Sequence, residues 1–173
     1  MQDLKKVKNI EDYYNRDNAD KHYEKLLYRD RKGVQASEHN ELQEIFERRL
    51  TSALNALFRD GDIIRDAQIA VNAQTGEVQA GSGAVYLNGA VRGVAPASFT
   101  IPTKGSVAVG IYLESRIVSE LEDPELYNPA RGSNTEGEEG AWRLQVNTAW
   151  GYEGDGSEGD FYVVHVVDDG VVR

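Results

Sequence analysis

The chain has 173 residues, a formal net charge of −10 and no cysteine. The missing cysteine excludes disulfides, thiolate nucleophiles and cysteine-ligated metals. The acidic balance argues against nucleic-acid binding, because neutralising phosphates requires a basic surface. No apolar run approaches the length of a membrane-spanning helix, and the first residues lack the apolar core of a signal peptide.

The charge is divided unevenly along the chain. Residues 1–66 hold 13 Lys and Arg against 14 Asp and Glu, a net charge of −1, whereas residues 67–173 hold 6 against 15, a net charge of −9. The simplest explanation is a solvated acidic surface. The alternative is a functional use of the acids, either in cation binding or in repulsion that spaces subunits apart.

The first 35 residues show no regular periodicity. They are basic at the start and then rich in tyrosine, with Tyr13, Tyr14, Tyr23 and Tyr28. A tyrosine brings a large apolar area together with a hydroxyl that requires a partner. This composition predicts either short helical turns or an extended docking arm that lies on a surface of its own chain or of a neighbour.

The next segment, SEHNELQEIFERRLTSALNALFRDG, predicts one long amphipathic helix. Ser37 is the expected N-cap, and Gly61 is the expected C-terminal stop. Apolar residues recur at three- and four-residue steps. Five of them fall within one sector of about 80°: Leu42, Phe46, Leu50, Ala53 and Leu57. We expect this stripe to pack against the sheet of its own chain, with an additional contact to symmetry-related copies left open.

From Asp62 onward the apolar period changes to two, which indicates strands. β-Branched and aromatic residues concentrate in GAVYLNGAVRGVA, ASFTIP, SVAVGIYLESRIVSEL, WRLQVNTAW and DFYVVHVVDD. Asn88 and Gly89 between two apolar runs are typical of a type I′ hairpin. Six or seven short strands without alternating helices favour an antiparallel sandwich or barrel over a parallel sheet.

These elements predict an α+β fold that is mainly β. Residues 1–61 are expected to form an N-terminal docking arm plus the long helix. Residues 62–173 are expected to form an antiparallel β domain, either a sandwich or barrel-like, with a long Pro/Gly loop at 122–141. The helix and the loop are therefore the two features that depart from a plain β domain.

The loop belongs to the stretch EDPELYNPARGSNTEGEEGAWRL, which lies between two predicted strands. Pro124 and Pro129 fix their own φ and keep the preceding residues out of helix. Loops of this length are usually functional or disordered. We hypothesise that the loop packs against a neighbouring subunit or another protein, the alternative being a tolerated insertion.

No motif indicates catalysis, a cofactor or a metal site. The histidines, His22, His39 and His165, have no ligand spacing, and GYEGDGSEGD does not place oxygen ligands in the register of a calcium loop. A nucleophile elbow and a phosphate-binding loop are both missing from the sequence. We therefore expect a protein that is not an enzyme, and a polysaccharide-cleaving activity is the least favoured alternative.

Aromatic residues near the second half of the predicted β domain offer another interpretation. Trp142, Trp150 and Tyr152 could form a platform on which sugar rings stack. Core or interface positions are the more ordinary use of such residues. A carbohydrate-binding module for host recognition is therefore kept as the alternative function.

Several stretches resemble a family of unknown function found at the N-terminal end of tail-fibre and baseplate-associated proteins of tailed phages. The resemblance rests on EDYYNR, KHYEKLLYRDRKGVQASEHNELQ, LFRDGDII, AVYLNGAVRGVAPASFTIP, EDPELYNPARGSNTEGEEGAWRLQV and EGDFYVVHVVDDGVV. It covers most of the chain, from about residue 12 to the end. No one motif is diagnostic, but their order and spacing together are specific.

The resemblance implies a structural protein of the phage virion, made in the host cytoplasm and located in the tail or baseplate. Such a domain is expected to anchor a tail fibre to the baseplate, usually as a homotrimer, without catalytic residues or cofactors. Its expected partners are other baseplate and tail-fibre proteins, and neither nucleic acid nor membrane. Two possibilities stay open: a standalone adaptor subunit, or the N-terminal part of a longer fibre.

We expect the interface residues to come from the arm, the helix and the proline loop. The candidates are Tyr13, Tyr14, Tyr23, Phe46, Phe58, Pro124, Tyr127, Pro129 and Arg131. Because most of the chain is acidic, we also expect the receiving surface to be basic and the association to weaken as salt rises.

Overall fold

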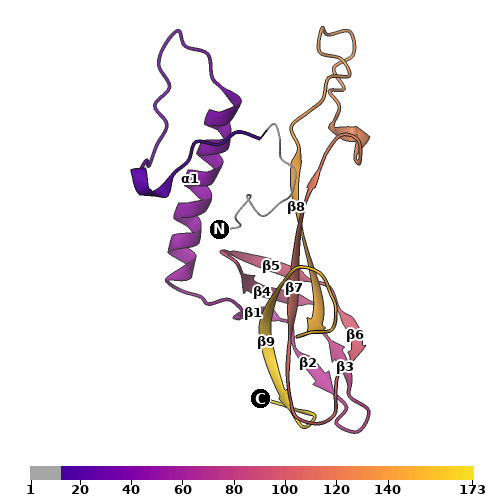
Figure 1. Ribbon diagram of the computed structural model, residues 1–173. Helices are drawn as coiled ribbons and strands as arrows, with labels where there is room; N and C mark the ends of the chain where they lie inside the picture. The colour runs from indigo at the N-terminus through magenta and orange to yellow at the C-terminus, as the bar shows by residue number, and fades with distance from the viewer. Residues whose placement is uncertain (1–12) are drawn as a thin grey trace.

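The computed structural model describes residues 13–173, a β body from which two projections rise (Figure 1). One projection is an α-helix, α1 (Ala36–Asn55), together with the chain that precedes it. The other is a ribbon formed by the ends of the two longest strands, β7 (Ser106–Val118) and β8 (Arg143–Tyr152). Residues 1–12 of the predicted docking arm lie outside the described part of the chain.

The strands form three antiparallel sheets, ordered β1-β4-β5, β2-β3-β6 and β10-β9-β7-β8. Two short 3-10 helices lie outside the sheets. The bounds of the remaining elements are η2 (Ala19–Lys21), β1 (Ile63–Asp66), β2 (Ile69–Val71), β3 (Glu77–Ala80), β4 (Gly83–Leu87), β5 (Ala90–Val94), β6 (Ala97–Thr100), η3 (Pro124–Leu126), β9 (Asp160–Asp168) and β10 (Val171–Val172).

One hydrophobic core joins the three sheets. Its buried members include Val78 on β3, Leu87 on β4 and Ile111 on β7. Trp150 on β8 belongs to the same core, and its Nε1 donates to the carbonyl oxygen of Gly81 at 3.0 Å, so its polar atom is satisfied. The mainly β, antiparallel class is confirmed, and this arrangement is compatible with the predicted sandwich or barrel.

The predicted hairpin turn is confirmed. Asn88 and Gly89 connect β4 to β5 with φ values of 48° and 82°, and Leu87 pairs with Ala90 directly below the turn. Two successive positive φ values are what a type I′ turn requires, and Asn-Gly adopts them at little cost.

Both ends of α1 differ from the prediction. The helix begins one residue before Ser37, after Gln35, whose backbone N–H bonds the Glu38 carboxylate at 2.8 Å. It ends at Asn55, well before Gly61. Three residues later, the ring of Phe58 contacts the buried Tyr86 of β4, with 5.5 Å between ring centroids. The chain leaves the helix there to reach β1.

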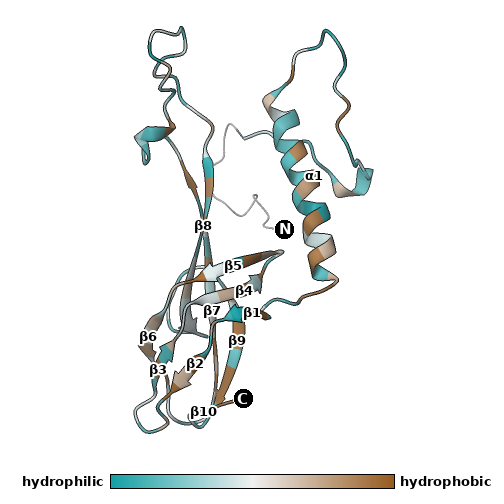
Figure 2. Ribbon diagram, turned by 180° about the vertical axis from the view of Figure 1, so that it is seen from behind, coloured by the Kyte–Doolittle hydropathy of each residue, from teal (hydrophilic) through white to brown (hydrophobic). Residues whose placement is uncertain are grey.

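The prediction that the apolar stripe of α1 packs against its own sheet is wrong. The helix is attached to the β body near its last turn, where the Tyr86 hydroxyl donates to Asn55 Oδ1 at 2.7 Å. Its hydrophobic residues remain exposed, and Figure 2 shows hydrophobic positions along α1 in brown. Their exposed fractions are 47% for Leu42, 66% for Phe46, 46% for Leu50 and 73% for Leu57.

The chain N-terminal to α1 covers the polar face of the helix instead. Arg16 Nε donates to Glu41 Oε1 at 2.7 Å, and Arg48 forms a salt bridge with Asp17. Glu41 and Glu44 are consequently buried. The described part of this segment contains the 3-10 helix η2 but no strand, so it follows α1 and does not join a sheet.

Glu44 gives a testable consequence of this burial. Desolvation, followed by the charges of Glu47 and Asp17, raises the pKa of its carboxyl above the ordinary 4.5. The folded state then binds more protons than the unfolded state, so stability falls as pH rises from 4.5 through the raised value. We expect Glu44→Gln to raise the free energy of unfolding at neutral pH, and to lose this advantage below about pH 4.

The measurement is urea denaturation at both pH values, with the exposed Glu24→Gln as the matched control. Equal stabilities of Glu44→Gln and the unmodified protein at neutral pH would contradict the expectation.

Gly110 gives a second prediction. It lies in β7 where the register with β9 shifts, and a Cβ there would sit 1.9 Å from the carbonyl oxygen of Tyr162. Because that atom belongs to the backbone, Gly110→Ala must push β7 and β9 apart, and we expect a loss of about 2 kcal/mol or more. At Gly93 on β5 the nearest atom is 4.0 Å away.

Gly93→Ala is therefore the control, and we expect it to change stability by no more than about 0.5 kcal/mol. Thermal and urea unfolding of the two variants would test the difference, and similar stabilities would refute it.

Candidate interaction site

The ribbon of β7 and β8 extends well beyond the β body. Pairing of β7 with β9 stops at Leu113, opposite Asp160, whereas pairing of β7 with β8 continues to Val118, opposite Arg143. Five more residues of strand correspond to about 17 Å. The chain between the two strands, residues 119–142, is called the tip, and it contains the predicted loop.

The free part of the ribbon has one apolar and one polar face. Ile117 pairs with Leu144, and side chains on the opposite face pair as Arg116 with Gln145. Arg116 Nε donates to Gln145 Oε1 at 2.6 Å, while Leu144 stays 42% exposed. The ribbon therefore carries a sided surface outside the core.

The tip is organised by its own hydrogen bonds, largely through Asn128. The Asn128 backbone N–H donates to Glu138 O at 2.9 Å, and its Nδ2 donates to Thr135 Oγ1 at 2.9 Å. Its Oδ1 accepts from the N–H of Ala130 at 3.0 Å. These bonds close a neck between the two sides of the tip, so the loop has a defined shape without packing on the β body.

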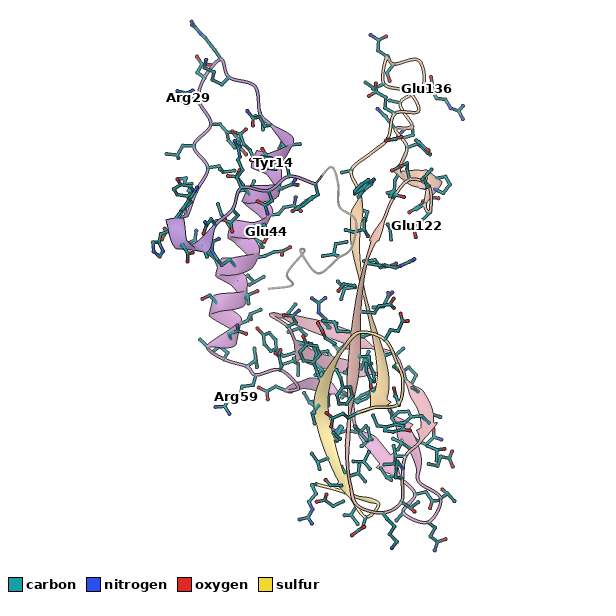
Figure 3. All side chains as sticks on the ribbon, in the orientation of Figure 1. Tyr14, Arg29, Glu44, Arg59, Glu122 and Glu136 are labelled. Carbon is teal, nitrogen blue, oxygen red and sulfur yellow. The ribbon has the colours of Figure 1, made fainter. Side chains whose placement is uncertain are left out.

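The tip accounts for more than half of the net negative charge of the chain. It has one basic residue, Arg131, and seven acids, a net charge of −6. Figure 3 shows Glu122 and Glu136 at the far end of the ribbon, away from the β body. The acids are Glu120, Glu122, Asp123, Glu125, Glu136, Glu138 and Glu139.

One of these acids is held inside the base of the tip. Glu120 is 5% exposed, and its Oε2 accepts from Trp142 Nε1 at 3.2 Å. This bond joins the two sides of the tip where the ribbon ends, so the six other acids are presented outward from a fixed base.

The structure brings four of the predicted interface residues together on the tip. Pro124 begins the 3-10 helix η3, and Tyr127 follows it half-buried. Pro129 and Arg131 lie exposed further along the tip. The interface role of these four residues stays a prediction, and the structure places them on the tip at the end of the ribbon.

Four of the other five predicted residues lie on the α1 projection, which is apart from the tip (Figure 1). Tyr13, Tyr14 and Tyr23 are exposed beside the helix, and the Tyr14 carbonyl accepts from Asn40 Nδ2 at 2.9 Å. Phe46 is exposed on α1. The fifth, Phe58, contacts Tyr86 within its own chain, as described above.

Sequence reasoning left open a contact between the stripe and other copies of the chain, but it did not name Leu42, Leu50 and Leu57 as interface residues. Helical periodicity found them, but the same pattern is typical of a helix that packs on its own core. Only the place of α1 beside the β body distinguishes the two uses.

Within residues 13–173, no group of three or more His, Cys, Asp or Glu side chains is arranged to hold a metal ion. Asp155, in the acidic glycine-rich segment, accepts instead from the backbone N–H groups of Tyr152 and Ser157, at 3.0 and 2.8 Å. The described chain also has no helix of the length and apolarity needed to cross a membrane.

The aromatic platform considered for sugar binding does not form. Trp150 is 7% exposed and belongs to the core, where its ring stacks on His165 with 6.2 Å between centroids. Trp150 follows Trp142 by eight positions, which corresponds to about 26 Å along extended chain. Trp150 therefore lies in the core, whereas Trp142 lies at the base of the tip.

Comparisons with known proteins give one family. The model described as Domain of unknown function (DUF4815) matches residues 12–173. No curated protein matches the chain. Among solved structures, the crystal structure of TssK is similar, with a TM-score of 0.39 and 9% sequence identity over 86% of this chain and 40% of that chain. The chain thus spans less than half the length of TssK. Because the family model matches nearly all of the sequence, the chain belongs to the family named Domain of unknown function (DUF4815).

Proposed function

We propose that this protein is a non-catalytic structural component of a phage virion, an attachment module that links a tail fibre to the tail baseplate. In this proposal it acts as a homotrimer, and its partners are other baseplate and tail-fibre proteins. Its location is the tail or baseplate of the virion. The proposal is supported by the order and spacing of the sequence motifs and by one structural observation.

That observation is the tip. It is a polar loop with a defined shape, and the ribbon holds it about 17 Å beyond the last residue that β9 pairs with. A loop that contributes nothing to its own core, yet is ordered by bonds at Asn128, is suited to contact another protein. Its prior order reduces the entropy lost on binding.

The charge of the tip defines the chemistry of that partner. A net charge of −6 on one loop favours a basic receiving surface, because opposite charges accelerate encounter and fix orientation. Exposed charge pairs are screened by salt. The tip is therefore the docking element of the proposed attachment module.

Immunogold electron microscopy of purified phage particles from the source of the chain tests the location. We expect gold at the baseplate or at the fibre bases, because the tip is proposed to dock there. Gold only at the distal fibre ends would favour host recognition, and absence of the chain from the particles by immunoblot would refute the proposal.

The role of the charge can be tested in the tip itself. We expect the triple variant Glu136→Gln, Glu138→Gln and Glu139→Gln to bind more weakly to purified tails that lack this chain, and to lose part of the salt dependence of binding. Co-sedimentation across a range of salt concentrations measures both effects.

A matched control removes the same number of charges elsewhere on the surface. Its substitutions are Glu24→Gln, Glu153→Gln and Glu158→Gln, all at exposed positions. The control should bind as the unmodified chain does. Equal losses in the two variants would show that total charge matters and that the tip has no special role.

A further inference from the structure

The apolar stripe of α1 is a hydrophobic surface that the core of the described chain does not use. It extends from Leu42 on α1 to Leu57, two residues beyond the end of the helix at Asn55, and four of its side chains are between 46% and 73% exposed. A soluble protein rarely leaves a continuous apolar surface in water unless another surface covers it.

The helix already uses its other face. Arg16, Asp17 and the helix residues Glu41 and Arg48 form the ionic contacts of the polar face. At 100° per residue this face lies about 150° from the centre of the stripe. The N-terminal segment and the stripe therefore occupy opposite sides of α1, and the contacts on one side leave the other open.

The total surface indicates how much of this chain is available for contacts. A compact monomer of 19.2 kDa is expected to expose about 8,400 Å², whereas this chain exposes 11946 Å². Subtracting about 2,100 Å² as an upper bound for residues 1–12 still leaves an excess of about 1,400 Å². A standard interface takes about 800 Å² from each partner, so the excess is larger than one such contact per copy.

The edges of the stripe carry complementary charges. Arg49 lies about 60° to one side of its centre and Glu47 about 100° to the other. Both are exposed, and neither side chain makes a hydrogen bond or salt bridge with residues 13–173. In parallel helices around a common axis, unlike edges face each other, whereas antiparallel helices bring like edges together. The charges therefore favour a parallel arrangement of identical helices.

We propose that the stripe is the contact between copies of this chain, with the α1 helices parallel and side by side. The part of this contact from which water is excluded is called the seam, and its residues follow each other at steps of four, three and four. They are Phe46, Leu50, Ala53 and Leu57. This inference rests on the homo-oligomer of the proposed function and names its interface. The tip remains free on the other projection to bind the basic partner.

The test uses the purified full chain. Sedimentation equilibrium at micromolar concentration should give a multiple of the 19.2 kDa mass. The double variant Phe46→Gln and Leu50→Gln should give the mass of one chain with an unchanged circular dichroism spectrum, because glutamine is a good helix former. A control with Val34→Gln and Leu121→Gln, exposed apolar residues outside the stripe, should keep the oligomer.

Cysteine cross-linking tests the arrangement without depending on the folding of the double variant. The chain has no cysteine, so Leu57→Cys introduces a single thiol at one end of the seam. Parallel helices bring two such thiols together, and mild oxidation should give a covalent dimer. Leu121→Cys, in the tip, should give none.

A monomeric unmodified chain would overturn the inference, whether the stripe is then free, covered by its own chain or covered by a different protein. Retention of the oligomer by the double variant, or failure of Leu57→Cys to cross-link, would overturn it as well. These outcomes can be distinguished from those of the immunogold experiment. If the chain is an oligomer but is absent from phage particles, only the virion role is refuted. If it is present in the particles but is a monomer, only the proposed contact between α1 helices is refuted.

Discussion

The attachment of α1 at one end governs the shape of the molecule. Tyr86 is fully buried in β4, and it holds the helix by a hydrogen bond to Asn55 and a ring contact with Phe58. The next contact along the helix, one turn earlier, is longer: Thr51 Oγ1 donates to the Gly89 carbonyl oxygen at 3.5 Å. Because the anchor lies beside the last turn, the rest of α1 projects from the β body and its apolar side does not reach the core.

The usual sidedness of a surface helix is thereby reversed. Charged residues such as Glu41 and Glu44 are covered, and leucines remain in water. Burying a leucine or phenylalanine side chain contributes about 1.5–3 kcal/mol, so a lone copy forgoes a stabilisation that an assembled copy can obtain. The ionic contacts of the polar face are individually weak when solvent reaches them. They position the N-terminal segment on the polar side, and the hydrophobic side stays exposed.

Much of the β body could be predicted, because its signals are local. The alternation of apolar and polar residues predicted the long strands. The pair Asn88 and Gly89 predicted a turn whose backbone conformation few other residue pairs adopt. The helix was also predicted, but its partner was not. An apolar stripe indicates that one side of a helix makes hydrophobic contacts, but it does not indicate with which surface, so the exposure of Phe46 could not be predicted from the pattern. The tip was predicted as a stiff loop from Pro124 and Pro129, whereas its bonds at Asn128 depend on contacts across the loop that no spacing rule gives.

The neck at Asn128 also affects the order in which the ribbon can fold. The strands β7 and β8 are separated by the whole tip, and the entropy lost on closing a loop grows with its length. The bonds from Asn128 to Thr135 and Glu138 join residues only seven and ten positions apart, so they can form before the strands meet. Local contacts of this kind form fastest. Once the neck is closed, the remaining pairs can zip from the tip toward the β body, in the single register that places Trp150 in the core.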